Sequence, residues 1–154
     1  MPLELSCGGF VLSNPIVTRA EFQQLADTRL EEAKALLDVG KWDGAYYLAG
    51  YAVEVALKAC IIKLIMATDA FPEKRFSERC YTHDIEELIA LARLKVAWNA
   101  AVAADPVLSQ YWDTVKQWSE QKRYHRMSEA ESRDLYTAVA DPSHGVLTWF
   151  KTQW

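Results

Sequence analysis

The 154-residue sequence has few cysteines, glycines and prolines and no long apolar run, and each shortage excludes a class of protein. Its three cysteines are an odd number without a Cys-x-x-Cys pair, which excludes a disulfide framework and a zinc ribbon and fits reduced thiols in a cytosol. The longest uncharged run, residues 5–18, is shorter than the roughly 20 apolar residues of a membrane-spanning helix. We therefore expect a cytoplasmic protein that is not a membrane protein.

Positive charge is also in short supply, with 17 Lys and Arg residues against 21 Asp and Glu residues. This balance argues against DNA binding through charge spread over the whole molecule and leaves room only for a local basic patch. Hydrophobic residues make up 51% of the chain and aromatic residues 12%, which excludes a disordered protein. The length suits one compact domain with a well-packed core.

Familiar catalytic motifs are missing too. The sequence has no P-loop, no His-Glu-x-x-His and no Gly-x-Ser-x-Gly, so it offers no starting point for P-loop nucleotide hydrolysis, zinc proteolysis or serine-hydrolase chemistry. Cys80 and His83 have the spacing of half a metal site, but no second half exists, and His83 is equally suited to the start of a helix. His144 is expected at the surface or an interface. We predict no metal and no cofactor.

Residues 1–18 are predicted to form an extended arm, and residues 19–154 a helical domain. Gly8-Gly9 and Asn14-Pro15 interrupt the arm, and Phe10-Val11-Leu12 between them is its one candidate strand. Thr18 and Glu21 form a capping-box pattern at the start of a helix predicted over residues 19–38.

The next segment, residues 42–66, is apolar on almost every face, which is typical of a helix at the centre of a bundle. Glu54 and Lys58 are an exception, placed at i and i+4 in the favourable order for an ion pair. If partly buried, such a pair is weak evidence for stability and points to a specific role. Small side chains on the same segment let a neighbouring helix approach closely; they are Ala45, Ala49, Ala52, Ala56 and Ala59.

The remaining chain also has helical periodicity. We predict a loop over residues 72–79, a third helix from Asp84 with a buried face reaching Val96, and a fourth opened by Asp105-Pro106. A final helix begins at a Ser128 capping box and continues, kinked, past Pro142; a break with Asp141 as a new cap is the competing interpretation. The sequence therefore predicts an all-α fold, an antiparallel up-and-down bundle of four to five helices.

The densest charged feature is the stretch 116–126, in which only Glu120 opposes the basic residues and aromatic rings are interleaved. Guanidinium groups bind phosphate oxygens and exposed rings stack on unpaired bases, so this stretch is a candidate contact for single-stranded RNA or a nucleotide. A solvated interhelical turn with Tyr124 packed inward remains open. The candidate binding residues are Lys116, Lys122, Arg123, Tyr124, His125 and Arg126.

Four segments, taken in order, resemble the HEPN domain family. Residues 42–59 contain an Ala-Val-Glu-x-x-Leu-Lys-Ala core similar to the second HEPN helix. Thr82-His83-Asp84 before an apolar helix, the Arg123-Tyr124 turn and the last amphipathic helix follow in the same order. The resemblance covers about residues 19–152.

The resemblance implies a helical bundle that often forms a homodimer with its groove at the interface. It also implies one of two activities, metal-independent RNA cleavage or non-catalytic binding of RNA or nucleotides, and many members are toxins paired with a minimal nucleotidyltransferase. Cleaving members carry an Arg followed by a His after four to six residues. Here the corresponding positions after Arg123 are Ser128, Glu129 and Ala130, so the motif is missing.

Three hypotheses follow. The leading one is a non-catalytic HEPN module that binds RNA, a nucleotide or a protein in a toxin–antitoxin-type system through the stretch 116–126. The second is a metal-independent ribonuclease that uses Arg123 and His125 in an irregular arrangement, because RNA cleavage needs a base and a group that stabilises the phosphorane. The third is a structural partner of a minimal nucleotidyltransferase, with Trp154 as the best candidate interface residue.

Overall fold

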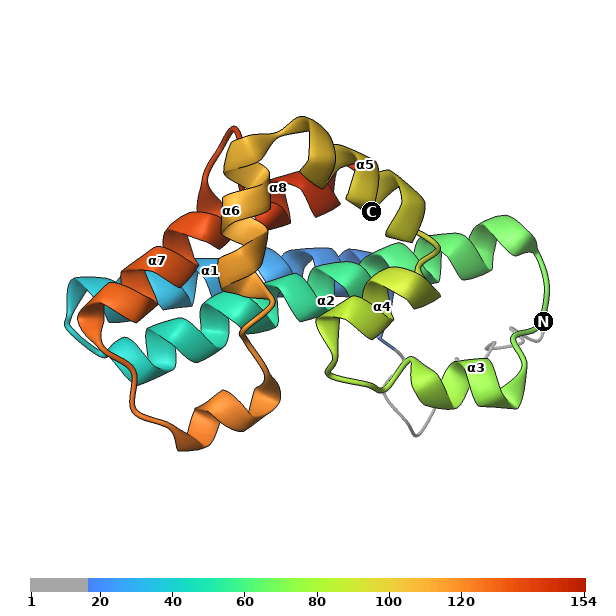
Figure 1. Cartoon of the computed structure of the whole chain (residues 1–154). Helices are drawn as coiled ribbons and strands as arrows, with labels where there is room; N and C mark the ends of the chain where they lie inside the picture. Colours follow the sequence, from blue (N-terminus) through green and yellow to red (C-terminus); the bar gives the residue numbers. More distant parts are fainter. Residues whose placement is uncertain (1–16) are drawn as a thin grey trace, which may run out of the picture.

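The computed structural model describes residues 17–154, which form an all-α bundle built around one long central helix (Figure 1). Within these residues there is no strand, so the predicted all-α fold is confirmed. The predicted strand at residues 10–12, and the arm apart from its last two residues, lie outside the described residues. The elements are α1 (Arg19–Asp38), α2 (Trp42–Thr68), α3 (Lys74–Arg79), α4 (Ile85–Leu91), α5 (Lys95–Ala104), α6 (Pro106–Val115), the 3₁₀ helix η1 (Glu120–Tyr124), α7 (Glu129–Ala140) and α8 (Val146–Lys151).

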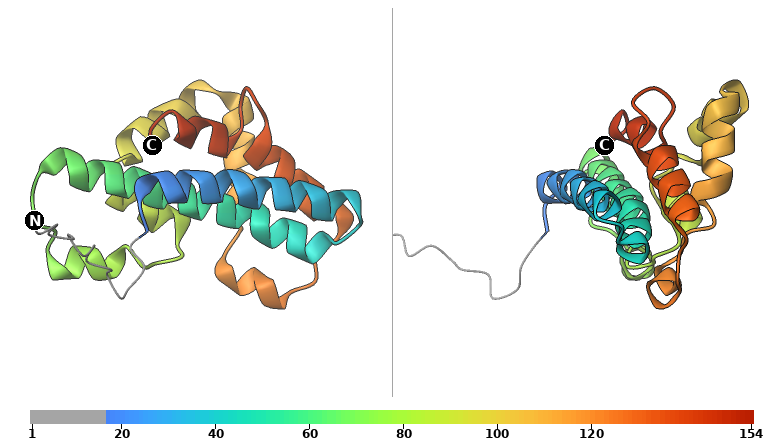
Figure 2. Two further views of the ribbon diagram at one scale, coloured as in Figure 1. Left: turned by 180° about the vertical axis from the view of Figure 1, so that it is seen from behind. Right: turned by 90° about the vertical axis from the view of Figure 1, so that its left-hand side faces the viewer.

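Helices α1 and α2 form an antiparallel pair that lies side by side in both views of Figure 2. The predicted capping box is present: the Thr18 hydroxyl accepts a hydrogen bond from the Glu21 amide at 3.2 Å, and the Glu21 carboxylate accepts one from the Thr18 amide at 2.7 Å. The chain then turns at Gly40, whose positive φ of 72° suits glycine.

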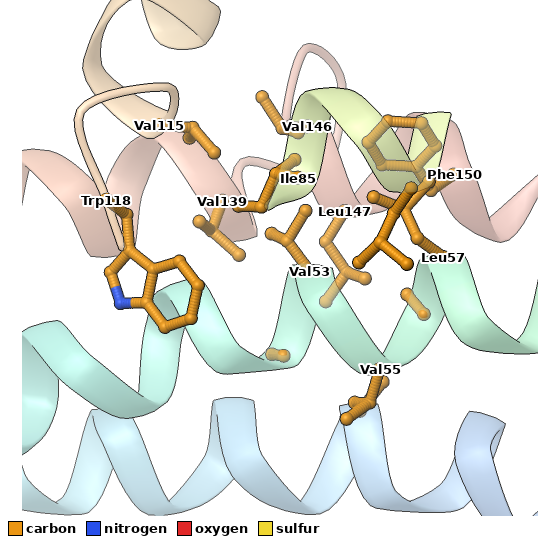
Figure 3. Close-up of a cluster of buried hydrophobic side chains, with 14 of the residues drawn as sticks. Val53, Val55, Leu57, Ile85, Val115, Trp118, Val139, Val146, Leu147 and Phe150 are labelled. Atoms are coloured by element: carbon orange, nitrogen blue, oxygen red, sulfur yellow. The ribbon is translucent and has the colours of Figure 1, made fainter. Parts of the chain in front are cut away.

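Helix α2 occupies the centre, as its apolar pattern predicted. The five alanines of the small-residue pattern are 0% exposed. Figure 3 shows Val53 and Leu57 facing the cluster formed with Leu147 and Phe150, and Val55 facing α1 on the other side. Because the helix is covered on most of its circumference, a polar side chain on α2 is either buried or confined to one narrow face.

Two predictions for residues 72–104 are wrong. The charged stretch expected to be a loop contains the short helix α3. The predicted helix through Val96 instead ends at Leu91, and the chain turns through Arg93 in the left-handed conformation, with φ 57°. This turn leaves Val96 84% exposed and starts α5, which carries Trp98 into the core against three aromatic rings. The rings are Trp112, Trp149 and Phe150.

The predicted continuous helix across Pro142 is also wrong, and the competing break is correct. Helix α7 ends at Ala140, and the Asp141 carboxylate accepts hydrogen bonds from the amides of Ser143 and His144. Gly145, not Asp141, is the N-cap residue of α8. A side chain would not fit at this position, because a Cβ added to Gly145 would lie 2.4 Å from the Asp141 carbonyl oxygen. The helical spacing of apolar residues continues across the break because α7 and α8 pack against the same core.

Candidate functional site

One face of α2 carries a row of polar and aromatic side chains. Tyr47, Tyr51, Glu54 and Lys58 recur at helical spacings of four, three and four residues, so they lie on one side of the helix. Glu54 is buried, with a side chain only 1% exposed, and the Lys58 side chain is 17% exposed. Burial raises the pKa of Tyr51, and the negative charge of Glu54 raises it further.

Glu54 is the centre of a hydrogen-bonded network that joins three elements. Its Oε1 accepts a hydrogen bond from Lys58 Nζ at 2.8 Å and lies 3.0 Å from His83 Nδ1. The other ring nitrogen of the histidine, Nε2, lies 3.2 Å from Glu120 Oε2. Glu54 Oε2 is buried and has no hydrogen-bond partner among the described residues. The network ties the loop before α4 and the 3₁₀ helix η1 to the central helix; we call it the Glu54 network.

Sequence reasoning did not assign His83 to this network. The sequence alone suggests that His83 is half a metal site or the start of a helix, whereas in the structure Asp84 caps α4 by accepting a hydrogen bond from the Glu87 amide at 2.9 Å. An imidazole can donate through both nitrogens only when both carry protons. A neutral His83 can therefore donate to only one of the two carboxylates that flank its ring.

A cavity of about 560 Å³ opens beside His83. It lies between the start of α4 and the segment joining α6 to η1, so the network forms part of its wall. Asp84, Glu86 and Glu120 contribute negative charge to the lining, and Lys116 contributes positive charge. Trp118, which also lines the cavity, is 4% exposed.

The basic stretch continues from this cavity into an exposed turn formed by residues 122–126, which we call the basic corner. Arg123 lies over the ring of Tyr124, with its guanidinium carbon 4.9 Å from the ring centroid. Tyr124 is 72% exposed, so the alternative in which this ring packs inward is wrong. Its hydroxyl is the main cause of a raised pKa for Arg123, to which Glu120 and Tyr47 also contribute.

The other predicted binding residues are distributed around the corner. His125 lies with Nδ1 2.9 Å from the Gln121 carbonyl oxygen, and Arg126 is 97% exposed, with a guanidinium nitrogen 3.5 Å from Asp43. Lys122 is half-buried. Lys116 pairs with Asp113 on α6 rather than with the corner. Arg123 and His125, the pair of the ribonuclease hypothesis, therefore engage different groups.

The fold and the site together define a helical domain whose central helix presents a buried carboxylate to a histidine, next to an exposed basic corner. A family model described as HEPN domain matches residues 21–151, so the chain belongs to the HEPN domain family. This is a family of nucleotide-binding and ribonuclease-type modules that often dimerise. The chain has no match among curated proteins or among solved structures.

Two features are absent from residues 17–154. No helix in that range is both long and apolar enough to cross a membrane. Within the same range, no three or more His, Cys, Asp or Glu side chains converge in a way that could hold a metal ion.

Proposed function

We propose that this HEPN domain binds single-stranded RNA through the basic corner without cleaving it. The observation that carries the proposal is the stacked pair of Arg123 and Tyr124 on an exposed turn. Arg123 presents a planar cation that can bond phosphate oxygens, and Tyr124 offers a ring on which an unpaired base can stack. Arg126 extends the cationic surface by one further side chain.

The small size of the corner sets the expected mode of binding. It holds the cations Lys122, Arg123 and Arg126 in a protein with a net charge of −4, so contact with a long duplex is disfavoured. A few phosphates and one or two stacked bases fit the available groups. The logarithm of the binding constant should therefore fall with the logarithm of salt concentration with a slope of only about −1 to −2.

Our first prediction concerns this surface. Protein is titrated into a labelled RNA oligonucleotide, and binding is followed by fluorescence anisotropy. Arg123→Ala should weaken binding about tenfold, because it removes a phosphate contact and the cation stacked on Tyr124. Tyr124→Ala should have an effect of similar size through lost base stacking. Arg75→Ala is the matched control, since Arg75 is an exposed arginine on α3. Unchanged affinity in Arg123→Ala and Arg126→Ala would rule out RNA recognition by the corner.

RNA cleavage is a second candidate function, favoured by the position of His83. Glu120 is shared by His83 and by Arg123, whose pKa it raises, whereas His125 bonds the backbone of its own turn. In this alternative, Glu120 moves away from Nε2, and a neutral His83 that donates its Nδ1–H to Glu54 takes the 2′-hydroxyl proton on Nε2. The 2′-oxygen then attacks phosphorus and displaces the 5′-oxygen, while Arg123 stabilises the phosphorane charge. The base is thus His83 rather than the His125 of the sequence-based hypothesis.

The second prediction separates the two candidate functions with a cleavage assay in excess chelator. Under our proposal, the purified protein leaves RNA intact while still binding it. If cleavage occurs, His83→Ala should slow it by about 100-fold or more, and His125→Ala should have little effect. Cleavage that is lost in His125→Ala and retained in His83→Ala would instead support the irregular Arg123 and His125 site.

A further inference from the structure

Helix α3 lies to one side of the bundle, near the C-terminal end of α2, as Figures 1 and 2 show. None of its residues is fully buried, and its one large apolar side chain, Phe76, is only partly covered by the core. An apolar cavity of about 560 Å³, the α3 hollow, lies between this helix and the α1–α2 pair. Most of its lining is apolar or aromatic, and Lys58 and Ser77 are the two polar side chains; the other lining residues are Val17, Phe22, Ile61, Ile65, Cys80 and Tyr81.

The lining of the hollow is open to solvent at its edges. Tyr81 is 80% exposed and Val17 is 47% exposed, although both line the same hollow. A second apolar cavity of about 380 Å³ follows on the other side of Ile65 and reaches Phe71, which is 98% exposed. Contiguous apolar surface of this kind usually marks a binding or interaction site.

The sequence supplies an occupant of matching chemistry. Val17 lines the hollow and is the first described residue, so residues 1–16 join the domain at the edge of the cavity. Phe10-Val11-Leu12 is the most apolar part of those residues, and the run 5–18 carries no charge. The link from Leu12 to Val17 is long enough to span about 17 Å, which is enough to place these side chains in the hollow. Tethering raises their effective concentration to about the millimolar range.

We propose that Phe10, Val11 and Leu12 of the same chain fill the α3 hollow and hold α3 against the α1–α2 pair. The driving force is the removal of apolar surface from water on both partners. Gly8-Gly9 on one side and Asn14-Pro15 on the other separate the three residues from the rest of the chain and let it turn. The interaction is independent of the basic corner, so it neither needs nor supports the proposed RNA binding.

The third prediction uses the thiol of Cys80 as a probe, because Cys80 lines the hollow. The full chain is treated with N-ethylmaleimide, and modification of each of its three cysteines is followed separately by peptide mass spectrometry. Phe10→Asp and Val11→Asp should each speed modification of Cys80 about tenfold or more, because a short carboxylate side chain cannot replace the apolar contacts that hold the segment in the hollow. Ser13→Asp is the matched control in the same uncharged run and should leave the rate unchanged.

Equal Cys80 rates in Phe10→Asp, Ser13→Asp and the parent chain would overturn the proposal. A chain lacking residues 1–13 should react as fast as Phe10→Asp, and adding a synthetic peptide of residues 1–16 should restore protection. Protection that fades on dilution, together with a dimer by light scattering, would show that the arm of a second copy fills the hollow and would overturn the same-chain arrangement. RNA affinity, measured in parallel, should not change in any of these variants.

Discussion

Gly50→Ala is expected to destabilise the protein substantially, although alanine is the better helix former. Gly50 lies in the middle of α2, where the indole of Trp118 packs directly on the helix backbone. An added Cβ would lie 2.2 Å from Trp118 Cδ1, and the obstacle is a buried ring rather than the free end of a flexible side chain. Overpacking of this kind costs about 3 kcal/mol, at the upper end of the usual range. The helix propensity of alanine returns only about 1 kcal/mol.

The free energy of unfolding is measured by urea unfolding followed by tryptophan fluorescence, and Tm by thermal unfolding. A net loss of about 2 kcal/mol should lower Tm by about 4–8 °C for a domain of this size. Gly44→Ala is the matched control on the same helix, because its Cβ would lie 3.0 Å from the terminal methyl group of Leu36, which can move. If both variants have the same stability, Trp118 does not occupy the position that the structure gives it.

Gly50→Ala is also expected to affect the basic corner, because Trp118 lies between the core and η1. Trp118 lies two residues before the start of η1 and contacts Tyr47, with ring centroids 5.7 Å apart, so a displaced indole also displaces the turn that follows. We therefore expect Gly50→Ala, and not Gly44→Ala, to weaken RNA binding as well. A close approach enforced by one glycine thus sets where the corner lies relative to α2.

Local patterns in the sequence were sufficient to predict the elements that depend on neighbouring residues. The segment from Trp42 is apolar on almost every face and has no polar side wide enough for solvent, so its central position follows from periodicity alone. The capping boxes at Thr18 and Ser128 and the Asp105-Pro106 helix start are also local and are confirmed. The ion pair of Glu54 and Lys58 was predictable for the same reason, since both residues are on one helix.

The breaks in the helices were not predictable from periodicity, because the apolar phase continues across them. Arg93 adopts a left-handed conformation without the glycine or asparagine that would announce it. The contact of Glu54 with His83 joins residues 29 positions apart, and that of His83 with Glu120 depends on where η1 lies. A candidate site built from such contacts needs the tertiary structure, whereas the basic corner was visible in the sequence because its residues are contiguous.

Lys58→Met is expected to have the largest effect on stability of any change outside the apolar core. Lys58 is the cationic partner of a carboxylate that is 1% exposed and already has one oxygen without a hydrogen bond among the described residues. Removing the ammonium leaves a buried charge supported by His83 alone, and stranding one member of a buried pair costs about 3–5 kcal/mol. Lys34→Met provides the matched control, since Lys34 forms an i,i+4 pair with Asp38 in which both side chains are more than half exposed. That loss should stay below about 1 kcal/mol.

A double variant tests whether the cost comes from the stranded charge rather than from lost packing. Glu54→Leu combined with Lys58→Met replaces the pair with apolar side chains of similar size, a change that is often neutral or stabilising for buried ion pairs. The double variant should therefore be more stable than Lys58→Met alone in urea unfolding, although His83 then keeps only its contact with Glu120. If the two substitutions instead add, the pair contributes through packing, and its charge has no special role. Rescue of stability together with weaker RNA binding would show that α2 retains the ion pair to hold His83, and through it η1, in place for the basic corner.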